Sequence, residues 1–453
     1  MKLKLLCLIL SVLTVIPLAG CGDDRAVCTC YIAGFGSSEI YPLPDTELYI
    51  AGYKNGKSPD GILDLPQIRG IWLECGEKSM LLLSVDCIAL DSGTVENIRS
   101  ALKDFSNKTG CDEIHVFSTH THASVDTLGL WGNVAQDGKN GLYMQAVYDS
   151  SVIAAESAYN DRRSGCFTYG KTDAGELQYD SREPQVYDSY LYQLRFIPDD
   201  KTPGIRILNF AAHAESLRGD NTLISRDYVG VLEDVICEKT SDRVMFLQGA
   251  IGGLIMTDEI CDTDADAEAN MRATGERLAE LALGICEESV EDVLLLSKTV
   301  SARVPLDNAL FLYYKFLGIL GNKISSGGGE TGYSIITTVT RITVGDVTLL
   351  CLPCEIFPEL VCGDGLADGD PEPLAEIAAD AGVEKLIVVN LCDDEIGYVI
   401  PPSAFMLNPT LPYIDTFRDE TGENHYEETN SAGIETAGAV ADAVKKLFLR
   451  SCH

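Results

Sequence analysis

The chain has 453 residues and a formal net charge of −35, with 69 acidic side chains against 34 lysines and arginines. A surface this acidic excludes the electrostatic binding of nucleic acids and of anionic lipid headgroups, since both need clustered lysine and arginine. Because 46% of the residues are hydrophobic, the chain can bury the core of one large domain or two small ones; its sixteen cysteines follow no regular spacing.

The first twenty residues are predicted to be an export signal. Lys2 and Lys4 precede an apolar run that is too short, and too closely followed by polar residues, for a good membrane-spanning helix. The run ends in LAGC at positions 18–21, which resembles the lipobox of bacterial lipoproteins, where the cysteine carries the lipid. The sequence therefore predicts an exported cell-surface lipoprotein, anchored to the membrane at Cys21 and followed by a short tether over residues 21–32. An ordinary signal peptide cut nearby is the alternative.

Apolar strands then alternate with helical patterns. Residues 94–110 predict a helix with Thr94 as its N-cap and Gly110 as its stop. Continuous apolar strands between helices predict an α/β or α+β fold with mixed sheets and covering helices. A single catalytic domain over residues 33–453 is the simplest division, because no internal repeat or long linker interrupts the pattern. The predicted strands are 79–90, 113–119, 204–210, 243–249, 347–353 and 385–391, and further helices are expected near 143–160, 265–287 and 431–449.

Residues 306–332 break this alternation. The stretch is aromatic and aliphatic on nearly every side and then becomes a glycine run. A buried core helix with a flexible exit would give this pattern. A hydrophobic cap over a pocket for an apolar substrate, or a surface that contacts the bilayer, would give it as well. The sequence leaves these alternatives open.

Polar side chains follow four of the predicted strands. In open α/β sheets, functional sites form beyond the carboxyl ends of the strands. Imidazoles, a carboxylate and a phenol suit a catalytic zinc ion, which takes nitrogen and oxygen ligands and keeps one position for water. An H-x-H pair in extended backbone is expected to point both rings to one side. The side chains at these strand ends are His120 and His122, then His213, then Cys354 and Glu355, and then Asp393, Asp394, Glu395 and Tyr398.

Several segments resemble motifs of the neutral, non-lysosomal ceramidases, in family order. FSTHTHAS is similar to the A-T-H-T-H-S-G-P segment of that family, and NFAAHAESL with ISRDYVG resembles its second histidine strand and the turn that follows. LPCEIFPEL resembles the P-G-E segment, and IGYVIPP the G-Y-V-x-x-P segment. GFGSSEIYP and YIAGY loosely match the family's opening motifs. The chain is therefore identified as similar to the N-terminal, zinc-amidase domain of these enzymes.

The resemblance implies one catalytic zinc ion held by His120, His213, Glu355 and Tyr398. His122 falls on a site residue beside the metal and is a candidate catalytic proton shuttle, or a residue that orients His120 or Glu355. Tyr398 counts as both ligand and catalytic residue. The implied reaction is zinc-dependent hydrolysis of an amide, with a small N-acyl lipid or acylated amine as the binding partner. The alternatives are a substrate-binding scaffold lipoprotein without turnover, and a zinc hydrolase of a non-lipid amide or ester.

The sequence also departs from the family. Ile255 stands where the family has a site serine, and an isoleucine side chain cannot donate a hydrogen bond to a developing oxyanion. Gly253 and Met256 replace the aspartate and the proline of the same motif. The C-terminal immunoglobulin-like domain of full-length ceramidases is expected to be absent. Either zinc and other donors suffice, or the substrate differs, or activity is lost.

Other motifs are assigned structural roles. The CxxC pair at Cys351 is interpreted as a strand end with two thiols, because no second CxxC accompanies it. Residues 262–268 begin like a calcium loop but lack its glycine and its final glutamate, so a helix start is the better interpretation. His115 is expected to be structural, His425 to face solvent in an acidic loop, and Glu427 to contribute surface charge alone.

Overall fold

The computed structural model describes residues 30–42, 46–253, 255–257, 266–420 and 422–449. The predicted export signal, the lipidation site at Cys21 and the first half of the calcium-like motif lie outside these ranges. Among the described residues, no helix has both the length and the apolar character needed to cross a bilayer.

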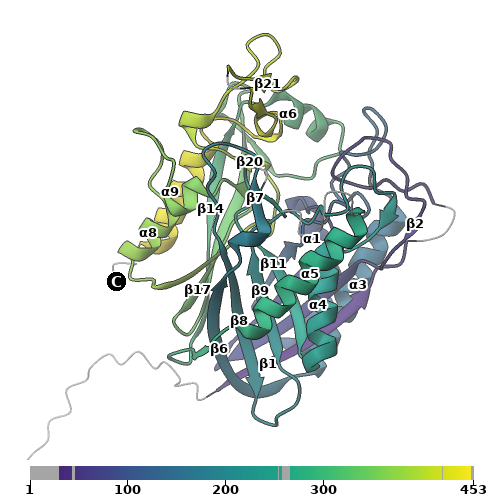
Figure 1. Cartoon of the computed structure of the whole chain (residues 1–453), viewed down its shortest axis with the longest axis vertical. Coiled ribbons are helices and arrows are strands. Elements are labelled where there is room, and N and C mark those ends of the chain that lie inside the picture. Colours follow the sequence, from purple (N-terminus) through teal and green to yellow (C-terminus); the bar gives the residue numbers. More distant parts are fainter. Residues whose placement is uncertain (1–29, 43–45, 254, 258–265, 421, 450–453) are drawn as a thin grey trace, which may run out of the picture.

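Two stacked sheets form the centre of the molecule (Figure 1). In the described part of the chain, the larger sheet has nine strands and the smaller has five. The larger sheet contains, in spatial order, β11 (Arg243–Gln248), β9 (Ile205–Phe210), β8 (Tyr190–Pro198), β6 (Arg163–Asp173), β1 (Tyr31–Glu39), β3 (Gln67–Cys75), β4 (Lys78–Val85) and β5 (Glu113–Ser118), with β13 (Glu288–Ser289) beside β6. The smaller sheet contains β14 (Leu295–Leu306), β16 (Tyr333–Val344), β17 (Val347–Cys351) and β19 (Lys385–Val389), with β15 (Ile324–Ser326) beside β16.

Strand alternation explains the layers. In β17, Leu349 and Cys351 belong to the core between the two sheets, whereas Leu350 packs into the core on the opposite face. In β4, Leu82 faces the second sheet and Leu81 faces the outer helices. Successive side chains of a strand point to opposite faces, so a run that is apolar throughout must be covered on both sides.

Helices supply the two outer layers. On the outer face of the larger sheet lie α1 (Ser92–Ala101), α2 (Lys103–Thr109), α3 (Gly141–Asn160), α4 (Asp227–Thr240) and α5 (Ala267–Gly284). On the outer face of the smaller sheet lie α7 (Glu359–Cys362), α8 (Leu374–Asp380) and α9 (Thr436–Phe448). The predicted fold class, mixed sheets with covering helices, is confirmed.

The helix predicted over residues 94–110 forms as two helices, α1 and α2, and begins earlier than expected. Asp91 is the N-cap, and its carboxylate accepts the backbone N–H of Thr94, so the assignment of Thr94 as N-cap was wrong. Asp91 satisfies an N–H group that has no partner within the helix. The predicted stop is confirmed, since Gly110 caps α2 with a φ of 73°.

The two edges of the larger sheet approach each other. β4 and β5 pair in parallel at one edge, and β9 and β11 pair in parallel at the other. The hydroxyl of Ser84 in β4 donates to the carbonyl of Phe246 in β11 at 2.8 Å. The carboxyl ends of β5 and β9 are thereby brought to one place, which is where the histidines lie.

The segment 306–332 does not form a core helix. It contains α6 (Ala309–Phe316), in which no side chain is fully buried, and Tyr313 and Phe316 are 50% and 67% exposed. In Figure 1, α6 lies near β21 (Phe417–Arg418), at one end of the molecule and away from the central layers. The core-helix alternative is therefore wrong, because the helix of this segment, α6, lies at the surface.

Candidate active site

The segments that follow β5 and β9 lie side by side. Thr121 forms a parallel bridge with Ala214, and the N–H of His122 donates to the carbonyl of Ala214 at 2.9 Å. The bridge sets His120 level with His213, with ring centroids 4.7 Å apart. Two sequence motifs 93 positions apart are thus joined into one site.

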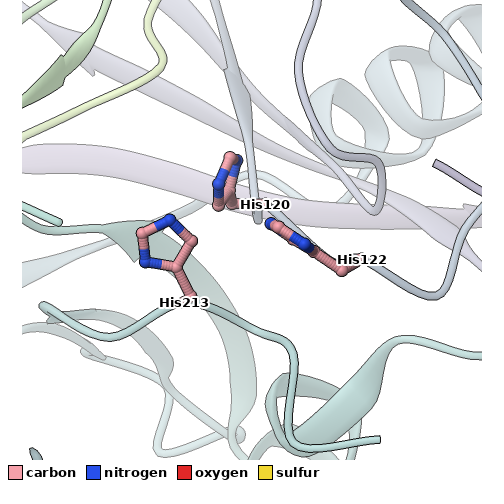
Figure 2. A group of neighbouring side chains, drawn as sticks. All are labelled: His120, His122 and His213. Carbon is pink, nitrogen blue, oxygen red and sulfur yellow. The ribbon is translucent and has the colours of Figure 1, made fainter. Parts of the chain in front are cut away.

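His120 and His122 face the same space, as predicted, but not because the backbone is extended. His120 has a φ of 64°, in the left-handed region that few non-glycine residues adopt. The two rings lie with centroids 4.8 Å apart, and Figure 2 shows the rings of His120, His122 and His213 around a common space. An unfavourable backbone conformation held by its surroundings is frequent at functional sites.

The rings of His120 and His213 are oriented by backbone carbonyls. Nδ1 of His120 lies 2.7 Å from the carbonyl oxygen of Ile88, and Nδ1 of His213 lies 2.8 Å from that of Ile255. A carbonyl can only accept, so in each ring Nδ1 carries the hydrogen. A neutral imidazole held this way has its free lone pair on Nε2, which is the arrangement of a metal-binding histidine.

Both Nε2 atoms face the same carboxylate oxygen. Oε2 of Glu355 lies 3.3 Å from Nε2 of His120 and 3.1 Å from Nε2 of His213. Burial opposes ionisation of Glu355, but when the two rings carry a proton on Nε2 their charge and hydrogen bonds outweigh burial and hold the pKa of that carboxyl well below its usual range. Two lone pairs and a carboxylate directed at one point need a proton or a cation between them. The donor set, nitrogen and carboxylate oxygen, fits a zinc ion.

Tyr398 enters the site through a second short parallel pairing. β18 (Glu355–Ile356) pairs with β20 (Tyr398–Val399), and Glu355 is the register partner of Tyr398. Burial, followed by the charge of Glu355, raises the pKa of the Tyr398 phenol well above its usual value. The structure therefore brings all four predicted zinc ligands together.

His122 has different neighbours. Its Nδ1 lies 3.5 Å from Oε2 of Glu215, and the hydroxyl of Tyr53 donates to the same carboxylate oxygen at 2.6 Å. The ring of Tyr53 also packs edge-on against that of His122. Burial, followed by the neighbouring imidazoles, lowers the pKa of His122 well below 6.5. Ligand nitrogens of all three histidines nevertheless lie within 4.8 Å of one another.

Sequence reasoning missed Glu215 and Tyr53. A signal was present, because Glu215 follows His213 by the same two-residue spacing that separates His122 from His120. The bridge between Thr121 and Ala214 turns H-x-H and H-x-E into facing pairs.

Ile255, in β12 (Ile255–Thr257), acts through its backbone. Its carbonyl oxygen lies 2.8 Å from the backbone N–H of His213 and 2.8 Å from its ring Nδ1. Its side chain is fully buried. The residue in the family's serine position thus fixes the orientation of one predicted ligand, while its side chain offers no donor to a substrate.

A cavity of about 360 Å³ opens onto these groups. Its polar lining includes His120, His122, Glu355 and Tyr398. Aromatic and aliphatic side chains form most of the remaining wall, among them Leu128, Leu130, Trp131, Leu310, Phe311, Tyr314, Leu320, Tyr413 and Ile414. Three of these come from α6, which supports the cap interpretation of residues 306–332.

Glu395 also lines the cavity. The sequence had identified it only as one of several polar residues that follow a predicted strand. One of its carboxylate oxygens accepts the backbone N–H of Gly397, and Oε2 is buried with no hydrogen-bond partner among the described residues. Burial and then the charge of Glu355 raise the pKa of Glu395 well above its usual value. Glu395 therefore presents an unpartnered carboxyl oxygen at the cavity wall.

His115 and His425 do not line this cavity. His115 is buried in β5 and pairs with Asp393 at 2.8 Å, so its structural assignment is confirmed. His425 is 3% exposed and Glu427 is 1% exposed, so the expectation that both face solvent was wrong. Both lie against the guanidinium of Arg182, which compensates the buried charge.

Comparison with known proteins identifies solved structures with a similar fold. No family model and no curated protein match the chain. Among solved structures, neutral ceramidase from Pseudomonas aeruginosa matches with a TM-score of 0.70 and 16% identity, over 92% of this chain and 74% of that chain. A ceramidase complexed with C2 matches with a TM-score of 0.69 and 15% identity, over 92% and 75%. The resemblance found in the sequence is confirmed as a shared fold.

Proposed function

We propose that this protein is a zinc-dependent hydrolase that cleaves the amide bond of an N-acyl lipid or a related acylated amine. The proposal rests on one observation: the Nε2 atoms of His120 and His213 converge on Glu355 at the lining of a mainly apolar cavity. The shared fold with neutral ceramidases supports the same reaction class.

One zinc ion would be held by His120, His213, Glu355 and Tyr398. When bound, zinc supplies a Lewis acid for the amide carbonyl and brings the pKa of a water molecule toward neutrality. The carbonyls of Ile88 and Ile255 keep both imidazoles in the tautomer that leaves Nε2 free. This supporting arrangement is ready before any ligand enters.

His122 is the proposed proton carrier. Its Nδ1 faces Glu215, and its Nε2 is buried without a hydrogen-bond partner among the described residues. Nε2 is therefore the atom that takes a proton from the attacking water. The same atom then delivers the proton to the amide nitrogen as the C–N bond breaks, which gives a free carboxylic acid and an amine.

The cavity wall favours an apolar acyl group. Leu310, Phe311 and Tyr314 of α6 line it together with Trp131 from the opposite segment. Burial of an alkyl chain against such a wall gains about 25 cal/mol for each Å² of apolar surface removed from water. Glu395 would bind a polar group of the substrate through its unpartnered Oε2.

Isoleucine at position 255 supports a second candidate function, ester hydrolysis. With no side-chain donor there, the site favours a substrate whose carbonyl needs less stabilisation than an amide, such as an ester. A scaffold lipoprotein that binds the substrate without turnover is the remaining alternative. An assay of matched amides and esters separates these cases, because a scaffold binds both and cleaves neither.

The experiment that tests the function combines metal content with hydrolysis of a panel of N-acyl amines. Wild-type protein should contain zinc and release free fatty acid. The isosteric Glu355→Gln variant should lose both properties, whereas Glu384→Gln, at an exposed carboxylate, should lose neither. Folded protein that binds no zinc at this site, or that turns over unchanged in the Glu355→Gln variant, contradicts the proposal.

We also propose that the protein is exported and held at the bacterial cell surface by a lipid on Cys21. The LAGC sequence supports this location, and a membrane-held enzyme would lie close to lipid substrates. A Cys21→Ala variant should move from the membrane fraction to the soluble fraction. If it remains with the membrane, the lipidation proposal is wrong.

A further inference from the structure

A hairpin beside the cavity carries a second group of metal-ligating side chains. β21 (Phe417–Arg418) and β22 (Asn424–His425) form the hairpin, and Ile414 before it and Tyr426 after it both line the cavity. Ligand atoms of Asp419, Glu423 and His425 lie within 4.8 Å of one another. Acidic residues often cluster on protein surfaces, so the two carboxylates alone do not indicate a metal site. The buried histidine beside them distinguishes this group from an ordinary acidic cluster.

The hydrogens of Arg182 determine the tautomer of His425. Nη2 of Arg182 lies 2.8 Å from the carbonyl oxygen of Ala404, 2.9 Å from Oε1 of Glu428 and 2.9 Å from Nδ1 of His425. Nη2 carries only two hydrogens, and the carbonyl and the carboxylate are its stronger acceptors. Nδ1 of His425 lies 2.9 Å from the same Oε1 of Glu428, so Nδ1 donates its own hydrogen there.

The other ring nitrogen of His425 is then left as a bare acceptor. Nε2 is buried and has no hydrogen-bond partner among the described residues. It faces Oδ2 of Asp419 at 3.7 Å, which is too long for a hydrogen bond. Two ligands of one tetrahedral zinc ion, each bonded at about 2.0–2.1 Å, stand roughly 3.3 Å apart, so a shared metal ion fits this separation closely.

The two carboxylates are already held in place. Oδ1 of Asp419 accepts the backbone N–H of Glu423 at 3.0 Å, and Oδ2 of the same carboxylate is the oxygen that lies 3.7 Å from Nε2 of His425. Oε1 of Glu423 accepts the backbone N–H of Glu183 at 2.6 Å, which ties the hairpin to another segment. Little order has to be created for a cation to bind, so the entropic cost of binding is small.

We infer that Asp419, Glu423 and His425 bind a divalent transition-metal ion, at a second site separate from the cavity. One imidazole and two carboxylates suit zinc or a neighbouring first-row ion, with water completing the coordination at the surface. The metal would link the two strands of the hairpin, β21 and β22, to each other. This inference does not depend on the reaction proposed for the cavity.

The test counts zinc in protein that lacks the first site. A His120→Ala variant is incubated with zinc, freed of excess metal by gel filtration and measured by elemental analysis. It should retain about one equivalent, and wild-type protein about two. Adding Asp419→Asn or Glu423→Gln to His120→Ala should remove the remaining equivalent, whereas Glu420→Gln, an exposed carboxylate on the same hairpin, should not.

Circular dichroism identifies the folded variants to which the count applies. Asp419→Asn alone should fall from two equivalents to one and keep the hydrolysis rate of wild type, which separates this site from the catalytic one. If folded His120→Ala holds no zinc, or if Asp419→Asn and Glu423→Gln leave its zinc unchanged, the inference is overturned. A failure of hydrolysis with two equivalents bound would instead count against the proposed function.

Discussion

Glu215 lies beside His122, with Oε2 3.5 Å from Nδ1, because Thr121 is bridged to Ala214 in the preceding position of each segment. The same bridge places His120 beside His213. The two histidines of the H-x-H pair therefore have different partners. One faces a carboxylate that a second imidazole shares, and the other faces a carboxylate held by Tyr53.

The first prediction concerns this division of roles. A His122→Ala variant should keep its zinc and lose turnover by ~10²–10⁴-fold, the usual contribution of a positioned proton-transfer group. A His120→Ala variant should lose both turnover and the zinc of the cavity. Metal analysis and hydrolysis of the N-acyl amine panel measure the two effects. If His122→Ala removes the metal as completely as His120→Ala, both rings are ligands and the proposed division is wrong.

The second prediction assigns Glu215 as a positioning residue. A Glu215→Gln variant keeps the shape but not the charge that faces Nδ1 of His122, so kcat should fall by ~10–100-fold with KM and zinc content nearly unchanged. Tyr53→Phe should have a smaller effect in the same direction. Glu238→Gln, exposed on α4, is the control. A loss of zinc or a large rise in KM without a change in kcat would argue for a structural or binding role instead.

The third prediction tests the cavity wall. Phe311 lines the cavity, whereas Tyr313, on the same helix, is 50% exposed. Phe311→Ala should raise KM for long acyl chains by about tenfold or more, because burial of an aromatic side chain against an alkyl chain is lost. Short acyl chains should be affected less. Tyr313→Ala should leave the chain-length series unchanged, and equal effects of the two variants would exclude α6 as a specific wall of the acyl site.

The fourth prediction concerns how stability depends on pH through the buried pair of His115 and Asp393. Burial lowers the pKa of His115, but the charge of Asp393 outweighs it and raises the pKa to about 10, against an ordinary value of 6.5. Between these values the folded protein binds more protons than the unfolded chain, so this pair's contribution is complete below about pH 6.5 and is lost as pH rises toward 10.

Urea unfolding at several pH values between 6.5 and 10 measures this contribution. The free energy of unfolding of the wild type should fall across the range by more than that of a His115→Gln variant, because the variant has no proton to release. Parallel slopes for the two proteins would show that His115 is not charged in the folded state.

Much of the fold could be predicted from the sequence, because it depends on local patterns. Apolar runs bounded by polar residues located β4, β5, β9, β11, β17 and β19, and Gly110 marked the end of α2 because glycine readily adopts a positive φ. The four candidate zinc ligands were named from the resemblance of their segments to ceramidase motifs, because residue type alone left a longer set of polar side chains at the strand ends.

Tertiary structure alone decided which side chains meet. Glu215 reaches His122 through a bridge between segments 93 residues apart, and Tyr53 joins them from a third segment; no local pattern encodes these pairings. From the sequence, His425 was expected at the surface because it lies in an acidic stretch. Its burial depends on Arg182, 243 positions away, which compensates the negative charge around it. Sequence periodicity indicates which face of a helix or strand is apolar. The partner of a polar group depends instead on the register of distant strands and on how the sheet edges meet, and the packing of the whole core determines both.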